Sequence, residues 1–154
     1  MSKLIINKLL IIDVETKKAK SVKFKDGVNI ITSSDNQVGK STIMKSLYYS
    51  MGAEVFFSER FQVKTKVHIV DFLVDKDTYT CIRYNDIVVI QKNQNQTVKC
   101  TSATQLAEVL MGIFGFGVFI ENKKNEFVLA PPVYYYTPYY IDQDYGWTKD
   151  INSF

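Results

Sequence analysis

The sequence predicts a mixed α/β domain, and three observations support that prediction. A β-branched run, "VNIIT" at 28–32, comes directly before a Gly-Lys-Ser-Thr string and a stretch with helical periodicity. Between residues 66 and 101 the apolar side chains recur at every second position, which is typical of antiparallel strands. The 154 residues, 46% hydrophobic and 23% charged, are ordinary for a globular chain and sufficient for one domain with its own core.

The first half of the chain is expected to combine strands with one helix. Residues 3–15 and 20–25 each alternate apolar with polar side chains, so each is predicted to be a strand. The run at 28–32 has the composition of a short buried strand. A helix is predicted from Lys40 to Met51, and Gly52 is its natural end.

The second half is expected to begin with a β-meander. Four strands are predicted between 66 and 101, separated by turns that contain Asp, Asn and Lys. Ser102 or Thr104 is predicted to cap a helix that ends near Phe114. Residues 115–130 are expected to hold a buried strand, a charged turn and a second apolar run.

The C-terminal stretch is dense in aromatic residues. Tyr134–Tyr140 is interpreted either as a packed segment, which we favour, or as a platform on which the bases of single-stranded nucleic acid stack. The sequence ends on Phe154 without a polar run, and we expect the polypeptide to continue into a further element.

The positive charge is concentrated in one stretch, although the total is small. The net charge is only +3, so the total does not indicate a strong polyanion partner. Five lysines in one short stretch form either a DNA-facing patch or, as we favour, a solvated strand face: Lys17, Lys18, Lys20, Lys23 and Lys25.

The composition excludes several classes of site. Cys81, Cys100 and the single histidine, His68, lack the spacing of a zinc site, and His68 is expected to be a surface or packed residue. The N-terminus has no small-residue cleavage signal, and the longest apolar run, 109–120, is too short to cross a bilayer. We therefore expect a cytoplasmic protein with no membrane partner.

The predicted strand–loop–helix unit carries a phosphate-binding pattern. Residues 34–41 follow the order Gly, four residues, Gly-Lys-Ser/Thr, except that Ser34 stands in the place of the first glycine. Gly39 would let backbone N–H groups approach phosphates at a helix N-terminus, and Lys40 would reach the β- and γ-phosphates. The Ser41 hydroxyl would coordinate Mg²⁺. The residues predicted to bind the nucleotide are Ser34, Asn36, Gln37, Val38, Gly39, Lys40, Ser41 and Thr42.

The stretch "FKDGVNIITSSDNQVGKSTIMKSLYYSMG", residues 24–52, closely resembles the start of the ATP-binding-cassette (ABC) heads of SMC-like coiled-coil ATPases. Asn36 matches the asparagine of that family's loop, whereas Ser34 and Gln37 replace glycines. The resemblance implies ATP and Mg²⁺ as ligands, and the α/β fold of a P-loop NTPase half-head in which an antiparallel β-subdomain follows the first helix. The strands predicted at 66–101 suit such a subdomain.

A second resemblance lies in "PYYIDQDYGW", residues 138–147, which is similar to the Q-loop segment of bacterial SMC-like ATPases, including those of anti-phage defence. It implies that Gln143 contacts Mg²⁺ and helps to place the attacking water, which would make it the catalytic residue of this chain. The neighbouring Asp142 and Asp144 are interpreted as solvated loop acids, which we favour, or as metal ligands or an acid–base pair.

The resemblance also implies what this chain lacks. Such heads are completed by a C-terminal lobe, reached through a coiled coil, that carries the signature motif, a Walker B aspartate and a catalytic glutamate. "VHIVD", residues 67–71, matches Walker B only superficially, because His68 interrupts it and Phe72 stands where the glutamate is needed. We therefore expect a single N-terminal ATP-binding lobe over 1–154, with little or no ATPase activity on its own.

The implied partners are the C-terminal lobe of the same head, a second head in a homodimer, and DNA. Within the lobe, the phosphate-binding unit covers about 28–52, the β-meander about 66–101 and the Q-loop segment about 134–147. ATP-driven engagement of two heads would control DNA binding, repair or anti-phage defence. Two alternatives stay open: a non-catalytic nucleic-acid-binding or assembly module with a vestigial loop, and a self-sufficient small P-loop kinase or NTPase. The missing Walker B and the β-meander argue against the second.

Overall fold

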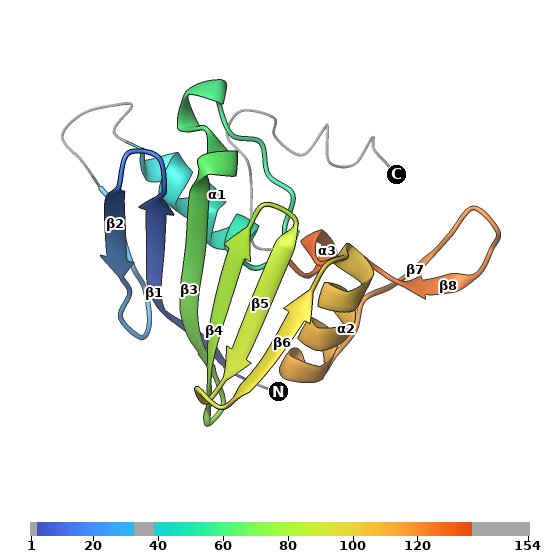
Figure 1. Ribbon diagram of the computed structural model, residues 1–154. Coiled ribbons are helices and arrows are strands. Elements are labelled where there is room, and N and C mark those ends of the chain that lie inside the picture. Colours follow the sequence, from blue (N-terminus) through green and yellow to red (C-terminus); the bar gives the residue numbers. More distant parts are fainter. Residues whose placement is uncertain (1–2, 33–38, 137–154) are drawn as a thin grey trace.

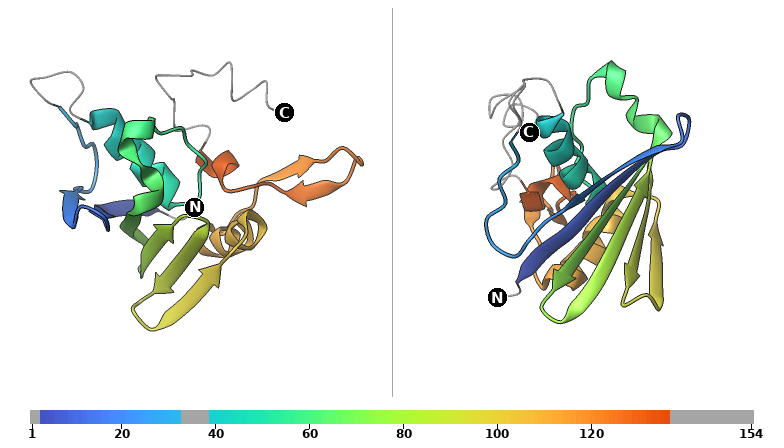
Figure 2. Two further views of the ribbon diagram at one scale, coloured as in Figure 1. Left: turned by 45° about the horizontal axis from the view of Figure 1, so that its top comes forward. Right: turned by 90° about the vertical axis from the view of Figure 1, so that its left-hand side faces the viewer.

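The computed structural model describes residues 3–32 and 39–136, in which helices cover one face of a six-stranded antiparallel sheet (Figures 1 and 2). The strand order is β2-β1-β3-β4-β5-β6, so β2 and β6 form the two edges. The strands are β1 (Leu4–Asp13), β2 (Lys18–Lys23), β3 (Lys66–Val74), β4 (Asp77–Tyr84), β5 (Ile87–Lys92) and β6 (Gln96–Cys100). The helices α1 (Lys40–Ser50), α2 (Ala103–Phe114) and α3 (Val133–Tyr136) share one side of the sheet (Figure 2).

The N-terminal part of the sheet is organised around β1, which pairs with β2 on one side and with β3 on the other. Alternation along β1 turns Leu9 and Ile11 toward the helices, where both are buried. The pairing with β3 shifts register between Ile6 and Lys8, which leaves Asn7 as an irregularity in the strand. The strands predicted at 3–15 and 20–25 are both present, and β2 begins two residues earlier than predicted.

The four strands predicted between 66 and 101 are present as β3 to β6, and each pairs antiparallel with the next. Every second side chain of β3 is buried against the helices: His68, Val70, Phe72 and Val74. The period-two pattern therefore identified both the strands and the face that packs. His68 is a packed residue, one of the two interpretations that the sequence allowed.

Helix α1 runs from Lys40 and stops at a glycine, as predicted. The backbone N–H of Gly52 donates to Tyr49 O at 3.0 Å, and its φ of 99° is left-handed. A Cβ at this position would come within 2.5 Å of the Leu106 side chain, so glycine also permits α1 to pack closely on α2. Helix α2 is capped by Ser102, whose hydroxyl accepts from the Gln105 N–H at 3.2 Å.

Arg83 of β4 connects the sheet to the end of α1. Its side chain is only 5% exposed, and its guanidinium lies 3.7 Å from the centroid of the Tyr49 ring. Nη1 donates to the backbone oxygens of Tyr49 and Ala53 at 2.9 and 3.3 Å, and Nη2 donates to the carboxylate of Glu54 at 2.6 Å. These bonds add a donor to Tyr49 O in the last turn of α1 and supply one to Ala53 O just beyond the helix.

Residues 28–32 do not form a strand, so the sequence prediction for this segment is wrong. Val28 and Ile30 are 91% and 81% exposed, and no strand of the described part of the chain pairs with the segment. A β-strand exists through its hydrogen bonds to a neighbouring strand, so β-branched composition alone cannot produce one.

The strand, the charged turn and the second apolar run predicted between 115 and 130 are present, but the prediction that the strand is buried is wrong. They form a two-stranded hairpin of β7 (Phe119–Glu121) and β8 (Phe127–Leu129), which projects from the body (Figure 1). Phe119 and Phe127 are 55% and 76% exposed, because no second layer among the described residues covers the hairpin. Two short 3₁₀ turns, η1 (Glu59–Phe61) and η2 (Val63–Thr65), complete the described elements.

Candidate nucleotide-binding site

The predicted phosphate-binding loop meets α1 at Gly39. Gly39 has φ 87° and ψ 17°, a left-handed conformation that is strained for residues with a side chain. A Cβ at this position would have Thr42 Cβ as its nearest neighbour at 4.0 Å, so the backbone conformation, and not crowding, requires glycine. The first turn of α1 contains no acid. No carboxylate in this turn offsets the positive end of the helix dipole, so the start of α1 favours an anion.

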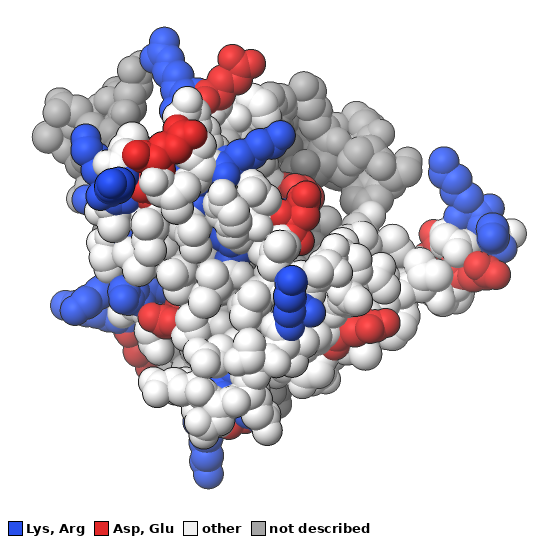
Figure 3. Space-filling model, in the orientation of Figure 1, with Lys and Arg blue, Asp and Glu red and all other residues white. Residues whose placement is uncertain are grey.

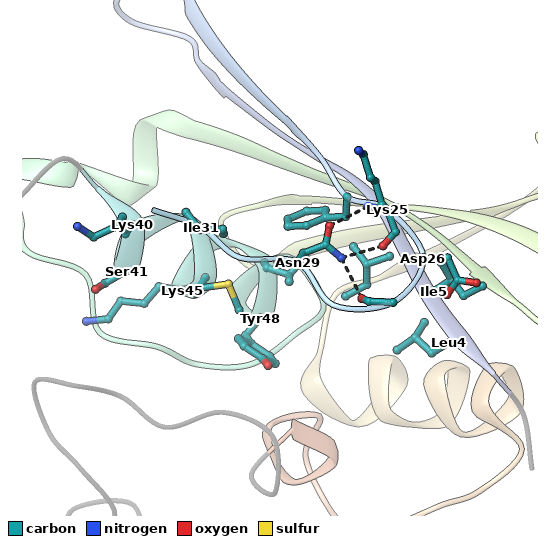
Figure 4. Close-up of a pocket in the computed structure, with 15 residues that line it drawn as sticks. Leu4, Ile5, Lys25, Asp26, Asn29, Ile31, Lys40, Ser41, Lys45 and Tyr48 are labelled. Atoms are coloured by element: carbon teal, nitrogen blue, oxygen red, sulfur yellow. Dashed lines mark hydrogen bonds between the residues drawn. The ribbon is translucent and has the colours of Figure 1, made fainter. Parts of the chain in front are cut away.

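A cavity of about 620 Å³ lies beside α1, within the size range of small-molecule sites (Figure 4). Lys40 and Ser41, which the motif predicted, both line it, and in Figure 4 they lie at the end of α1 where the predicted loop joins. The remaining walls come from the start of β1, from the turn after β2 and from one face of α1; the apolar ones are Leu4, Ile5, Ile6, Phe24, Ile31, Met44 and Leu47. The cavity thus combines a cationic end with an apolar wall.

Asn29 closes the turn that forms one wall of the cavity. Its Oδ1 accepts from the Lys25 N–H at 2.8 Å, and its Nδ2 donates to Lys25 O at 2.7 Å and to Gly27 O at 3.1 Å. Gly27 has φ 92°, which suits a tight turn. The sequence predicted a turn at Lys25–Gly27, but it gave no reason to single out Asn29, which lies inside the run predicted to be a strand.

Lys45 is a cavity residue that the motif did not indicate. Its side chain is only 6% exposed, and its ammonium lies 5.8 Å from the centroid of the Phe56 ring. It follows Ser41 by four residues, so the two share one face of α1, and Figure 4 shows the lysine extended toward the same helix end as Ser41. In the sequence, only its position four residues after Ser41 could have indicated that Lys45 lines the cavity.

Several predicted site residues lie outside the described residues: Ser34, Asn36, Gln37, Val38, Gln143, Asp142 and Asp144. Gly39, Lys40, Ser41 and Thr42 are described, and they form the start of α1. Half of the predicted nucleotide contacts are therefore brought together in the structure, while the catalytic role of Gln143 stays a prediction.

The two described tyrosines of α3 that follow Tyr134 are packed side chains. Tyr135 and Tyr136 are only 5% and 7% exposed, whereas a stacking platform needs open ring faces. The Tyr136 hydroxyl donates to Met51 O at 3.0 Å, and its ring centroid lies 5.7 Å from that of Tyr48. For these two residues the packed interpretation is confirmed, and they hold α3 at the C-terminal end of α1.

The other chemically reactive groups do not converge on the cavity. Asp71, the aspartate of "VHIVD", accepts from the Thr80 hydroxyl at 2.7 Å on the sheet face opposite the helices. Cys81 and Cys100 are buried and unbridged, and burial raises the pKa of the Cys81 thiol to about 12. Across residues 3–32 and 39–136, no three His, Cys, Asp or Glu side chains form a group able to hold a metal ion. No helix in the same ranges is long and apolar enough to span a bilayer.

Comparison with known proteins gives two curated relatives of the same name. Over its 154 residues the chain is 55% identical to a protein named Lamassu protein LmuB from Bacillus cereus (strain VD014). It is 25% identical, with 96% of the chain covered, to a protein also named Lamassu protein LmuB from a Bacillus species (strain NIO-1130). The chain spans only 27% and 26% of the lengths of these relatives. No protein-family model matches it.

Proposed function

We propose that this chain, a homologue of two proteins named Lamassu protein LmuB, is the N-terminal ATP-binding lobe of an SMC-like ATPase head that acts in anti-phage defence. The observation that carries the nucleotide-binding part is the left-handed Gly39 at the start of α1, with Lys40 and Ser41 lining one cavity beside it. The name of the relatives favours defence over repair, the two settings that the sequence resemblance left open.

The described residues fit a magnesium-bound triphosphate. The amide groups at the start of α1 and the Lys40 ammonium would bind phosphate oxygens, which are strong anionic acceptors. The Ser41 hydroxyl is the hard oxygen ligand that Mg²⁺ prefers, and the cation would neutralise phosphate charge during transfer. Lys45, which is buried, adds a second ammonium to the cavity wall. The apolar wall offers space for a nucleoside.

The cavity as described supplies binding groups but not the groups of a complete hydrolytic site. Among the described residues that line it, the only carboxylate is Asp26, which is paired with Lys3 at 2.9 Å. Phosphoryl transfer to water also needs a residue that orients the attacking water. We propose that Gln143 and a C-terminal lobe provide these functions, and that a second head engages the first when ATP is bound.

The exposed segment at 28–32 supports an incomplete head. Val28 and Ile30 present apolar side chains to solvent immediately before the phosphate-binding loop, although their composition is that of a buried strand. The relatives are almost four times as long as this chain, so most of their length lies beyond the matched region. A strand from that remaining length would pair with 28–32 and cover both side chains.

Thermal unfolding in the presence of ATP and Mg²⁺ tests the proposal. A ligand that binds only the folded chain stabilises it by about 2.7 kcal/mol at a concentration of 100 times Kd, so the melting temperature is expected to rise. Lys40→Ala is expected to abolish that rise, whereas the control Lys64→Ala, which removes an exposed lysine from η2, is expected to retain it. If ATP and Mg²⁺ raise the melting temperature of Lys40→Ala as much as that of the wild type, the nucleotide binds at another site and the loop is vestigial.

Turnover of ATP separates the half-head from a self-sufficient NTPase. Ordinary enzymes have turnover numbers of roughly 1 to 10³ per second. The turnover number of this chain alone for ATP is expected to be far lower. Addition of the remaining region of such a head in trans is expected to restore hydrolysis. Ordinary turnover by the 154-residue chain alone would contradict the half-head proposal.

A further inference from the structure

We propose that the β2 edge of the sheet binds the phosphate backbone of double-stranded DNA. The surface, here called the lysine edge, consists of Lys8, Lys17, Lys18, Lys20 and Lys23. This inference deepens the proposed function, because it names the surface through which such a head would engage DNA. It uses residues other than those of the nucleotide cavity, so the two proposals can fail separately.

The lysine edge contains more positive charge than the chain as a whole. Residues 8–25 include six lysines and two acids, an excess larger than the net charge of +3 of the entire sequence. On the side of the molecule where Figure 1 places β2, Figure 3 shows several basic side chains, with acidic side chains among them. A localised basic strip on a chain of low net charge is the electrostatic pattern of a polyanion-binding face.

The lysines of β2 are exposed on both sides of an edge strand. Lys18 and Lys20 share the sheet face of their partners Asp13 and Ile11, whereas Lys23 points to the opposite face. A rod-shaped polyanion lying along the edge would therefore meet ammonium groups from both faces. The six residues of β2 span about 20 Å, which is about six base pairs of duplex.

Nearby acids do not neutralise these lysines. In the described ranges, none of the five has a carboxylate within ion-pair distance. Of the acids in the hairpin and its following turn, Asp13 pairs with Lys66 at 3.0 Å and Asp26 pairs with Lys3 at 2.9 Å, while Glu15 forms no ion pair with the described lysines. The five lysines therefore outnumber the acids beside them, and the edge keeps an excess of positive charge.

One cross-strand pair is electrostatically unfavourable in the absence of an anion. Lys8 and Lys23 lie directly opposite each other on β1 and β2, and like charges in that arrangement destabilise a sheet. On its other side Lys8 faces the carboxylate of Asp71, which also accepts from Thr80 and whose negative charge offsets part of this repulsion. A phosphate between the two lysines would relieve their repulsion.

Protection of the sheet edge from aggregation is a competing reason for lysines on β2. The opposite edge strand, β6, contains a single lysine, Lys99, and is equally open. The edge strand β6 therefore has one lysine, whereas the edge strand β2 has three. The larger number at β2 indicates a role beyond edge protection.

The test is the salt dependence of DNA binding by the 154-residue chain without nucleotide. Fluorescence anisotropy of a labelled 30-base-pair duplex is followed between 50 and 200 mM KCl. The slope of log K against log salt is about −0.9 for each phosphate contact. The triple variant Lys18→Gln, Lys20→Gln, Lys23→Gln is expected to reduce the slope by about 2.7 and the affinity at least tenfold.

The matched control removes the same charge elsewhere. Lys99→Gln, Lys123→Gln, Lys124→Gln lies on β6 and on the β7–β8 hairpin, and it is expected to keep the wild-type slope. Equal losses in both triple variants would overturn the proposal in favour of bulk charge. If the lysine-edge variant keeps the wild-type slope of log K against log salt, the DNA proposal is overturned, whether or not the variant aggregates. The lysines would then serve only to protect the sheet edge.

Further measurements keep the outcome unambiguous. Binding of the lysine-edge variant to anionic phospholipid vesicles is measured beside its binding to DNA. If this variant loses vesicle binding but retains DNA binding, the DNA proposal is overturned and the edge is assigned to a membrane surface. Circular dichroism melts of all variants exclude unfolding as a cause of lost binding. Lys40→Ala is expected to bind DNA normally without nucleotide, while the lysine-edge variant is expected to retain protection by ATP and Mg²⁺. Failure of either proposal is therefore visible by itself.

Discussion

At the scale of single residues, His68 is an ionisable group that the fold holds neutral. It is fully buried between β1 and β4, and neither ring nitrogen has a hydrogen-bond partner among the described residues. The ring of Tyr49 lies 5.0 Å from its own, centroid to centroid. Burial, with smaller contributions from the positive charges of Arg83 and Lys66, lowers the pKa of His68 from 6.5 to about 4.

This shift predicts a stability change in a defined pH range. The unfolded chain takes up the His68 proton near pH 6.5, whereas the folded chain does so only near pH 4, so stability is full above pH 6.5 and falls as pH drops toward 4. We expect the free energy of unfolding to fall by on the order of 3 kcal/mol across this range. His68→Leu is expected to remove most of that dependence in urea denaturation measured at successive pH values.

The acids provide the control for the histidine. The hydrogen bond from Lys66 lowers the pKa of Asp13 from 3.8 to about 2, so its contribution is lost only below about pH 4. The two ranges do not overlap, and Asp13→Asn is expected to leave the change between pH 6.5 and pH 4 intact. A wild-type free energy of unfolding that is flat across that range would contradict the buried neutral histidine.

At the scale of elements, local periodicity was sufficient for α1, α2 and the meander. Each of these elements has its pattern in consecutive residues; the stop at Gly52 follows from a left-handed backbone, and the cap at Ser102 follows from a hydroxyl that bonds three residues along the chain. Lys45 and Asn29 were missed for a different reason. Their positions in the cavity wall depend on how α1 and the turn after β2 pack together, which no short pattern encodes.

The junction between α1 and β4 predicts an asymmetric pair of variants. Arg83→Met is expected to cost about 3 kcal/mol, because it removes the guanidinium donor from the buried Ala53 carbonyl and leaves Tyr49 O with only its bond from the Gly52 N–H. Glu54→Gln removes the charge of a partner whose side chain is 79% exposed, and is expected to cost at most about 1 kcal/mol. Chemical denaturation gives both values. Equal costs would place the stabilisation in the ion pair instead of in the carbonyl contacts.

At the scale of the whole molecule, the wrong predictions share one cause. The segment at 28–32 and the hairpin of β7 and β8 both have apolar composition, and both are exposed because no neighbouring layer in the described chain covers them. Composition reports the preference of a segment, whereas burial and pairing depend on what the rest of the protein supplies. The sequence could therefore predict the elements of this chain but not which of them lack a partner among the described residues.

Because the segment at 28–32 is exposed, substitutions in it are expected to leave the stability of this chain unchanged and to matter only when the remaining region of the head is added. Val28→Thr with Ile30→Thr is expected to change the free energy of unfolding of this chain by about 0.5 kcal/mol or less, because both side chains are already in solvent. The same pair is expected to weaken restoration of ATP hydrolysis by the remaining region of the head in trans. Phe127→Ser, an exposed apolar change on β8, is the control and is expected to permit restoration. Equal restoration by all three chains would contradict strand pairing at 28–32.

The bond from the Tyr136 hydroxyl to Met51 also sets the length of a tether. It fixes the chain at the C-terminal end of α1, and Gln143 follows only seven residues later. Seven extended residues reach about 23 Å, whereas the eleven residues of α1 measure about 16 Å. A chain of that length could bring the Gln143 amide to the Ser41 end of the helix while α3 stays docked, as the proposed role of Gln143 requires. Removing three residues would cut the maximum reach to about 13 Å, which is shorter than α1.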